Sequence, residues 1–303
     1  MKRIVLAAMA LALLLSLSPR ASAAVTTPQV AAKSAILMEK STGRILSEQN
    51  SHEKLSPASV TKVMSLLLIC EALNDGRISL TDIVTCSEHA ASMGGSQIYL
   101  EPGEKMSVED LLKSVVLGSA NDAVVALAEY LSGSEDAFVA LMNERAAALG
   151  CQDTNFLNAC GLDVDGHVTS AHDIALMSRA LLLEYPDIRN YTTIWMDSVR
   201  NGAFQLTNTN RLIRSYDGMT GLKTGFTSRA GHCLSATAER DGMELICVVL
   251  GSSSSAERFD AARGLLDFGF ANYTLCEVWP EGAASGCSPR YSQATPSSLR
   301  RAR

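Results

Sequence analysis

The segment that most restricts the fold of this chain is an apolar run over residues 60–69, which follows Pro57 and Ala58. Apolar side chains fill nearly every position of the run, so a helix formed by it has no polar face to turn toward water. Such a helix must be buried, and a chain of 303 residues with 47% hydrophobic composition can build a core large enough to enclose it. A side chain at its N-terminal end therefore lies on a rigid element, near backbone N–H groups and the positive end of the helix dipole.

Ser59 and Lys62 stand at that N-terminal end. Residues three apart share one helix face, so Lys62 can take the proton of the Ser59 hydroxyl and activate the serine without a histidine. Ser-x-x-Lys alone recurs by chance, but two further motifs follow it. Ser119-Ala-Asn121 comes 60 residues after Ser59, and Lys223-Thr-Gly225 comes another 104 residues later. Penicillin-binding proteins and serine β-lactamases carry such motifs in this order.

On these motifs the chain resembles the low-molecular-mass penicillin-binding proteins, which are D-alanyl-D-alanine carboxypeptidases of the penicillin-interacting serine acyltransferase superfamily. The resemblance extends from about Ala32 to Val278. It implies an α/β (α+β) fold of the β-lactamase/transpeptidase type, with an antiparallel sheet flanked by helices, an all-α lobe and an active site in the cleft between them. Four segments carry the resemblance in order: Pro57 to Lys62, Gly118 to Asp122, Gly161 to Gly166 and Thr220 to Thr227.

The resemblance implies a role for each motif in acyl transfer. Ser59 is the expected nucleophile, Lys62 its base, and Ser119 the group that passes the proton toward the leaving amine. A second cation, Lys223, in a partly desolvated cleft is expected to lower the pKa of Lys62. The resemblance implies no cofactor, and the histidines lack the spacing of metal ligands: His52, His89, His167, His172 and His232.

The same resemblance implies how the substrate is held. The backbone N–H groups of Ser59 and Phe226 are the expected oxyanion hole. Asn121 is expected to bond a substrate backbone amide, and the Lys-Thr-Gly motif a terminal carboxylate. The expected substrate-binding residues are Asn121, Lys223, Thr224 and Gly225.

The activity that this family implies is removal of the terminal D-alanine from peptidoglycan stem pentapeptides through an acyl-enzyme, with β-lactam antibiotics as covalent inhibitors. A class A-like β-lactamase is an alternative, but residues 153–158 lack the deacylating glutamate expected in that region. A non-catalytic penicillin sensor or wall-binding protein would need no base such as Lys62. Endopeptidase or transpeptidase activity on cross-links stays open.

Some polar residues also have structural interpretations. Ser119-Ala-Asn121 could cap a helix that starts at Asp122. Asp163, Asp165 and Asp173 fit loop bracing and helix capping better than chemistry.

The hydrophobic pattern places strands at both ends of the chain and a helical insert between them. Asp241-Gly242 reads as a two-residue hairpin turn, which would put Cys247 opposite Ala236 and on the other sheet face from Cys233. The sheet should be covered on both sides, because both faces of its last two strands are apolar. The expected strands are 34–39, 44–48, 204–208, 221–226, 232–238 and 244–250, and the expected helical parts are 107–185 and 257–270.

The N-terminus reads as an export signal over residues 1–23, with Lys2 and Arg3, an apolar run and the small residues of a cleavage site after Ala23. A buried N-terminal helix is the alternative. Cleavage would also remove Arg20, so three cations and no acid are lost and the net charge of −6 becomes −9. We expect an exported protein without an integral membrane span, and the acidic charge argues against nucleic acid as a partner.

Residues 24–272 are the expected serine D,D-peptidase catalytic domain. Residues 273–303 read as a truncated remnant of a C-terminal β domain, in which only a strand over 273–278 remains and a polar tail is expected to be disordered. The eight cysteines are expected to be mostly free or buried, with Cys151 and Cys160 the best candidates for a disulfide.

Overall fold

A computed structural model describes residues 27–276 and 299–301 of the chain. The export signal and its cleavage site lie outside the described residues. None of the described helices is long and apolar enough to cross a membrane.

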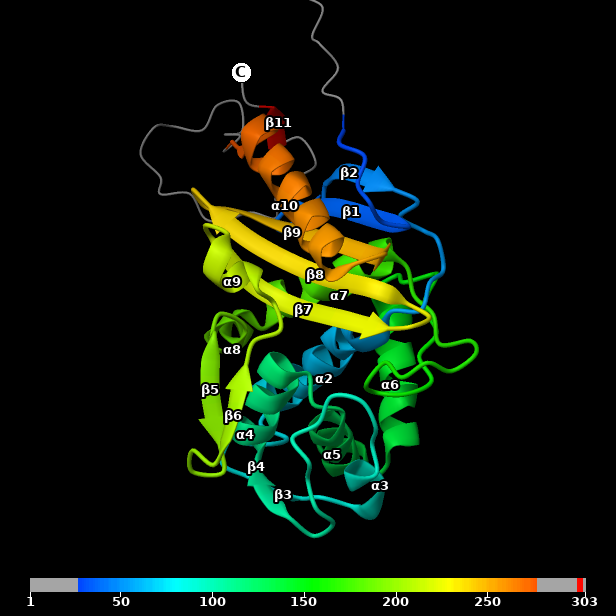
Figure 1. The fold of residues 1–303 in the computed structure, drawn as a ribbon, viewed down its shortest axis with the longest axis vertical. Helices are drawn as coiled ribbons and strands as arrows, with labels where there is room; N and C mark the ends of the chain where they lie inside the picture. The colour runs from blue at the N-terminus through cyan, green and yellow to red at the C-terminus, as the bar shows by residue number, and fades with distance from the viewer. Residues whose placement is uncertain (1–26, 277–298, 302–303) are drawn as a thin grey trace, which may run out of the picture.

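The centre of the fold is a five-stranded antiparallel sheet with the strand order β2-β1-β9-β8-β7 (Figure 1). Strands from the two ends of the chain meet in it, since β1 pairs with β9. This confirms the expected placement of the strands. The strands are β1 (Ser34–Glu39), β2 (Ile45–Gln49), β7 (Met219–Thr227), β8 (Gly231–Arg240) and β9 (Met243–Ser252).

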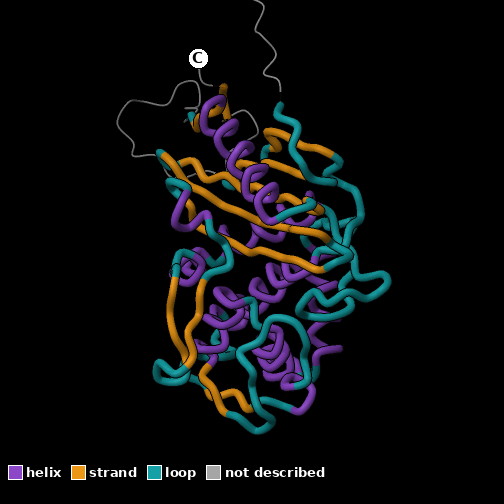
Figure 2. Tube along the Cα trace, viewed as in Figure 1, coloured by secondary structure: helices purple, strands orange, loops and turns teal. Residues whose placement is uncertain are grey.

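Helices cover both faces of the sheet, as its two apolar faces predicted. Leu245 and Val249 of β9 pack in one core cluster with α10 (Ser255–Asn272). Val248, on the opposite face, belongs to the larger cluster that includes α7 (Ala171–Glu184). Figure 2 shows the strands as a layer between these helices.

The hairpin between β8 and β9 has the predicted two-residue turn, because β8 ends at Arg240 and β9 begins at Met243. Cys247 lies opposite Ala236, and Cys233 and Cys247 belong to different core clusters. The cysteines that the structure describes are all free, so Cys151 and Cys160 form no disulfide.

The second lobe surrounds the apolar helix α2 (Lys62–Asn74), which packs against α5, α6 and α7. Ten of its side chains are buried, as its composition predicted. Serine side chains cap α4, α6 and α7, at Ser107, Ser134 and Ser170. The other helical elements of this lobe are η1 (Ala58–Thr61), α3 (Glu88–Ala91), α4 (Val108–Lys113), η2 (Ser114–Gly118), α5 (Asn121–Ser132) and α6 (Glu135–Ala148).

Two expectations for this part of the chain are wrong. Residues 149–170 form a loop between α6 and α7 rather than helix, with only isolated bridges such as Asn155 to Val168. The lobe is not all-α, and the strand predicted near 204 pairs outside the main sheet. The additional strands and helices are β3 (Ile83–Thr85) with β4 (Lys105–Ser107), β5 (Met196–Val199) with β6 (Phe204–Thr207), η3 (Pro186–Ile188), α8 (Arg189–Thr192) and α9 (Leu212–Ser215).

The C-terminal region contains β10 (Tyr273–Leu275), which is shorter than the strand expected over 273–278. It pairs with β11 (Leu299–Arg301). Residues 277–298 lie outside the described part of the chain.

Candidate active site

The predicted nucleophile and base lie at the junction of η1 and α2. Ser59 is in the 3₁₀ turn and half-buried, and Lys62 begins the α-helix with a fully buried side chain. Lys62 Nζ lies 3.0 Å from Ser59 Oγ, 2.6 Å from Asn121 Oδ1 and 2.7 Å from the backbone oxygen of Cys160. These three oxygens match the three donors of an ammonium group. The side chain therefore has a fixed position beside the serine hydroxyl.

Burial lowers the pKa of Lys62 to about 8, while the nearby Cys160 and Asp122 oppose the shift. The pKa of Lys62 is thus lowered as expected, with burial as its first cause. The repulsion between the two lysines appears on Lys223. The pKa of Lys223 is lowered well below its usual range, first by burial and then by Lys62 and Arg258.

Ser119 follows the π-helical turn η2, and Asn121 is the first residue of α5. Ser119 has a left-handed backbone with φ 61° and ψ 29°, and its buried hydroxyl has no hydrogen-bond partner among the described residues. Asn121 binds Lys62 through its side-chain oxygen and donates from Nδ2 to the backbone oxygen of Gly94 at 2.6 Å. The residue at the N-cap of α5 is Ala120, without a side-chain cap. The capping interpretation of this motif is therefore wrong, and strained backbone of this kind is common at functional sites.

Lys223, Thr224 and Gly225 lie on β7, which is an edge strand of the sheet and contacts η1. Lys223 is fully buried and donates to the backbone oxygen of Thr224 at 3.1 Å. The Thr224 hydroxyl donates to Thr209 Oγ1 at 2.6 Å. A side chain at Gly225 would place its Cβ 3.0 Å from the backbone nitrogen of Ser59, so only glycine lets the strand approach the turn this closely.

Phe226 follows this motif. Its ring is 57% exposed and stacks on His232, with 4.3 Å between ring centroids. Burial and the nearby Arg258 lower the pKa of His232.

Sequence reasoning missed Arg258, a largely buried cation on α10. Its Nη1 donates to the backbone oxygens of Gly225 at 3.1 Å and Cys233 at 3.2 Å, so it holds β7 and β8 behind the site. Burial lowers the pKa of Arg258 to about 10. An arginine in an ordinary amphipathic helix carries no local signal for this contact.

Sequence reasoning also missed the loop that closes over the turn. Asn158 Oδ1 accepts the backbone N–H groups of Gly161 at 2.6 Å and Leu162 at 3.1 Å, which shapes the segment whose Cys160 oxygen binds the base. Gly161 has φ +90°, and a Cβ there would lie 1.9 Å from the backbone oxygen of Ala58. The Gly161 to Gly166 motif was the only available signal.

The acids Asp163, Asp165 and Asp173 hold neighbouring groups in place, and none of them is a hydrogen-bond partner of Lys62. Asp163 accepts from the Thr227 hydroxyl at 3.0 Å, and Asp165 pairs with Arg229 at 2.5 Å. Buried Asp173 accepts from the backbone of Asp153 at 2.8 Å. Within the described residues, no group of three or more His, Cys, Asp or Glu side chains could hold a metal ion.

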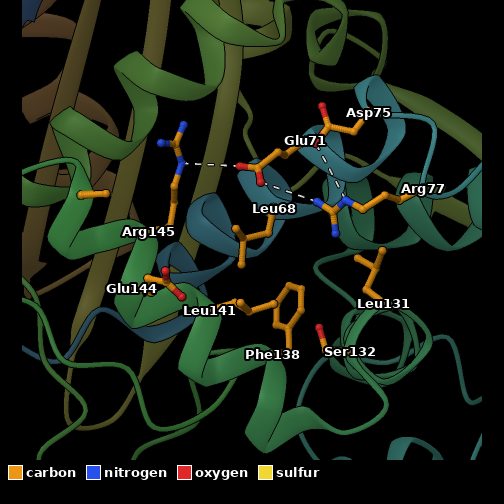
Figure 3. Close-up of a pocket in the computed structure, with 11 residues that line it drawn as sticks. Leu68, Glu71, Asp75, Arg77, Leu131, Ser132, Phe138, Leu141, Glu144 and Arg145 are labelled. Atoms are coloured by element: carbon orange, nitrogen blue, oxygen red, sulfur yellow. Dashed lines mark ion pairs between the residues drawn. The ribbon is translucent and has the colours of Figure 1, made fainter.

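A surface pocket of about 330 Å³ lies elsewhere, between α2, α5 and α6 (Figure 3). Phe138 lies in its wall, and Glu71 forms ion pairs with Arg77 and Arg145 beside it. None of the predicted site residues lines this pocket, so the pocket is separate from the candidate active site.

Solved penicillin-binding proteins share this fold. The structure matches penicillin-binding protein 6B of Escherichia coli with a TM-score of 0.81 and 35% identity, covering 88% of this chain and 85% of that one. Penicillin-binding protein D2 of Listeria monocytogenes, solved in an ampicillin-bound form, matches with a TM-score of 0.74 and 32% identity, covering 81% of this chain and 100% of that one. The fold and its site motifs define the class of low-molecular-mass penicillin-binding proteins.

Sequence comparison specifies the family. The profile of D-alanyl-D-alanine carboxypeptidases matches residues 21–254. The D-alanyl-D-alanine carboxypeptidase DacF of Bacillus subtilis is 49% identical over 245 residues, which are 80% of this chain and 63% of DacF. The chain belongs to the D-alanyl-D-alanine carboxypeptidase family.

Proposed function

We propose that the protein is a serine-type D-alanyl-D-alanine carboxypeptidase that removes the last D-alanine from peptidoglycan stem pentapeptides and is acylated by β-lactams. The observation that carries this proposal is the 3.0 Å separation of Lys62 Nζ and Ser59 Oγ on one rigid turn. Family membership and the ampicillin-bound Listeria relative support it.

Acylation begins when Ser59 Oγ attacks the carbonyl carbon of the penultimate D-alanine and Lys62 accepts the hydroxyl proton. With its pKa at about 8, roughly a tenth of Lys62 is neutral at pH 7. The developing oxyanion is bound by the backbone N–H groups of Ser59 and Phe226. The C–N bond then breaks, and the proton taken up by Lys62 passes through Ser119 to the departing D-alanine amine, so that Lys62 is neutral again.

Lys223 and Thr224 bind the terminal carboxylate of the substrate, and Gly225 lets their strand lie against the nucleophile. The carboxylate gives buried Lys223 the negative partner that its surroundings lack. Asn121 holds Lys62 and bonds the substrate backbone. Water then attacks the ester on Ser59, with Lys62 as base, and the shortened peptide leaves.

The β-lactamase alternative requires a carboxylate that activates water for rapid deacylation. The hydrogen-bond partners of Lys62 are oxygens of Ser59, Asn121 and Cys160, with no carboxylate among them. We therefore expect penicillin to leave Ser59 slowly, whereas peptide acyl groups turn over.

We further propose that residues 24–272 form the catalytic domain and act outside the cytoplasmic membrane after cleavage behind Ala23. The charged start, apolar run and small residues of the first 23 positions support this. N-terminal sequencing of the exported protein tests it, since a mature chain that retains residues 1–23 would contradict the proposal.

One pair of assays tests the activity. The purified protein is given a diacetylated-lysine D-Ala-D-Ala tripeptide and, separately, a chromogenic cephalosporin, and the penicillin adduct is located by mass spectrometry. We expect D-alanine release, slow cephalosporin turnover and one adduct on Ser59. Rapid cephalosporin hydrolysis without D-alanine release would instead identify a β-lactamase, and a folded protein inactive in both assays would identify a sensor.

A further inference from the structure

A buried hydrogen bond joins the loop over residues 149–170 to the middle of the Ser-x-x-Lys turn. His167 Nε2 lies 2.9 Å from the hydroxyl oxygen of Thr61, and both side chains are buried. Thr61 stands between Ser59 and Lys62 and ends the 3₁₀ turn η1. The bond therefore acts on the turn that sets the position of the nucleophile against its base.

The network around His167 determines its tautomer. The backbone N–H of Leu157 donates to His167 Nδ1 at 3.0 Å, so Nδ1 carries no proton. The neutral ring then has its proton on Nε2, which donates to Thr61 Oγ1. Burial lowers the pKa of His167 to about 4 against the opposing effect of the Asp163 carboxylate. The ring is thus neutral, with a defined donor and a defined acceptor, at neutral pH.

The segment that carries His167 is itself held firmly. Asn143 of α6 bonds both backbone groups of Phe156, at 2.8 Å each, and the Phe156 ring lies 5.7 Å from the His167 ring. Asn155 and Val168 exchange backbone hydrogen bonds of 2.9 and 3.1 Å. His167 can therefore restrain Thr61, because its own position is fixed from both sides.

The same loop touches the turn at two further points. The Cys160 oxygen accepts from Lys62, and Gly161 lies against the backbone oxygen of Ala58. These contacts and the His167 bond join the loop to the turn, which β7 also approaches where Gly225 lies against Ser59. The turn is therefore held by contacts with both the loop and the edge strand.

We propose that His167 is a positioning residue for acylation, which holds the Ser59 turn through Thr61 so that Ser59 Oγ stays within reach of Lys62 Nζ. This inference rests on the proposed roles of Ser59 and Lys62. Without the bond the turn moves relative to Lys62, and displacements of about 1 Å at reacting atoms cost roughly 100-fold in rate. A looser turn also admits water to Lys62 and reduces the burial that lowers its pKa.

The test compares two substitutions of Thr61 in the full chain. Thr61→Val keeps the shape and removes the hydroxyl, while Thr61→Ser keeps the hydroxyl. The rate of acylation by a fluorescent penicillin is measured between pH 6 and 10, with the adduct assigned by mass spectrometry. We expect Thr61→Val to acylate roughly 10- to 100-fold more slowly, with its pH profile displaced upward by about one unit. Thr61→Ser should recover most of the rate and the original profile.

Thr154→Val is the matched control. The Thr154 hydroxyl bonds Thr169 Oγ1 of the same loop and Asp173 Oδ2 of α7, each at 2.8 Å, and neither partner belongs to the turn. It should lower the melting temperature without changing the acylation rate or its pH profile. If Thr61→Val does not fold, His167→Gln, which keeps a donor, and His167→Leu, which keeps none, replace the Thr61 pair with the same expectations.

Acylation of Thr61→Val, or of His167→Leu in its place, at the original rate and pH dependence would overturn the inference while leaving the proposed function intact. An equal rate loss in Thr154→Val would also overturn it, since loop stability would then explain the effect. Failure of the unsubstituted protein to form a Ser59 adduct would contradict the proposed function itself.

Discussion

The candidate active site contains two buried lysines, Lys62 on the helix side (η1 and α2) and Lys223 on the strand side (β7), and their surroundings are opposite. On the helix side, Lys62 has three oxygen acceptors from Ser59, Asn121 and Cys160. On the strand side, Lys223 donates to one acceptor among the described residues, the backbone oxygen of Thr224, and two cations lower its pKa further. A buried ammonium without a counter-charge is costly. From this difference we infer that the helix side is complete for proton transfer, and we propose that an anionic ligand completes the strand side.

The strongest test of this comparison removes the lysine of the helix side. Lys62→Ala should slow penicillin acylation by about 100- to 10,000-fold, the usual contribution of a general base, because Ser59 loses its proton acceptor. Labelling kinetics and circular dichroism measure the rate and the fold. Lys105→Ala, at an exposed position on β4, is the control and should acylate normally. A small rate effect in a folded Lys62→Ala protein would mean that another group is the base.

The next test removes the lysine of the strand side. Lys223→Ala should weaken substrate binding by roughly 10- to 150-fold, since a hydrogen bond to a charged group contributes about 1.5–3 kcal/mol. The effect should appear mainly in KM, measured by D-alanine release. A substrate whose C-terminal carboxylate is amidated serves as the comparison and should lose little. Equal losses on both substrates would show that Lys223 does not recognise the carboxylate.

The pH dependence separates the two lysines without substitution. Lys62 must be neutral to accept a proton, so acylation should rise about tenfold per pH unit at low pH and level off above its pKa of about 8. Stopped-flow labelling with penicillin between pH 6 and 10 gives the profile. Because folding lowers this pKa from 10.5, the unfolded chain binds more protons between about pH 8 and 10.5, and the Lys62 contribution to stability should increase with pH across that window. A rate that is flat from pH 6 to 8 would contradict the assignment of the base.

The smallest expected effect concerns the surface ion pair between Asp165 and Arg229. Asp165 is 95% exposed and pairs with Arg229 at the surface, so Asp165→Asn should leave D-alanine release and acylation unchanged. Steady-state kinetics in 0.15 M salt check this. A large loss would place the 161–166 loop in substrate binding, contrary to the bracing interpretation.

Local patterns predicted much of the fold. The hairpin at Asp241-Gly242 correctly placed Cys247 opposite Ala236, because a two-residue turn fixes the register and strand side chains alternate. The apolar run after Ser59 correctly predicted a buried helix. The helical stretch predicted over 107–185 did not separate out the loop over residues 149–170, whose backbone is bonded by side chains such as Asn158 and Asn143. Such tertiary hydrogen bonds override local propensity.

The order of residues specifies the reactive side chains of this chain and their succession. It also places Ser59 and Lys62 on one turn, because spacing along a helix is a local property. Their surroundings depend on the tertiary fold. The Cys160 oxygen that holds Lys62 is a backbone atom that any residue would supply, and Arg258 reaches the Gly225 oxygen from a distant helix. The lowered pKa of Lys62 likewise comes from burial by the whole fold. Contacts between distant segments, made through backbone atoms and desolvation, leave no pattern in the order of residues.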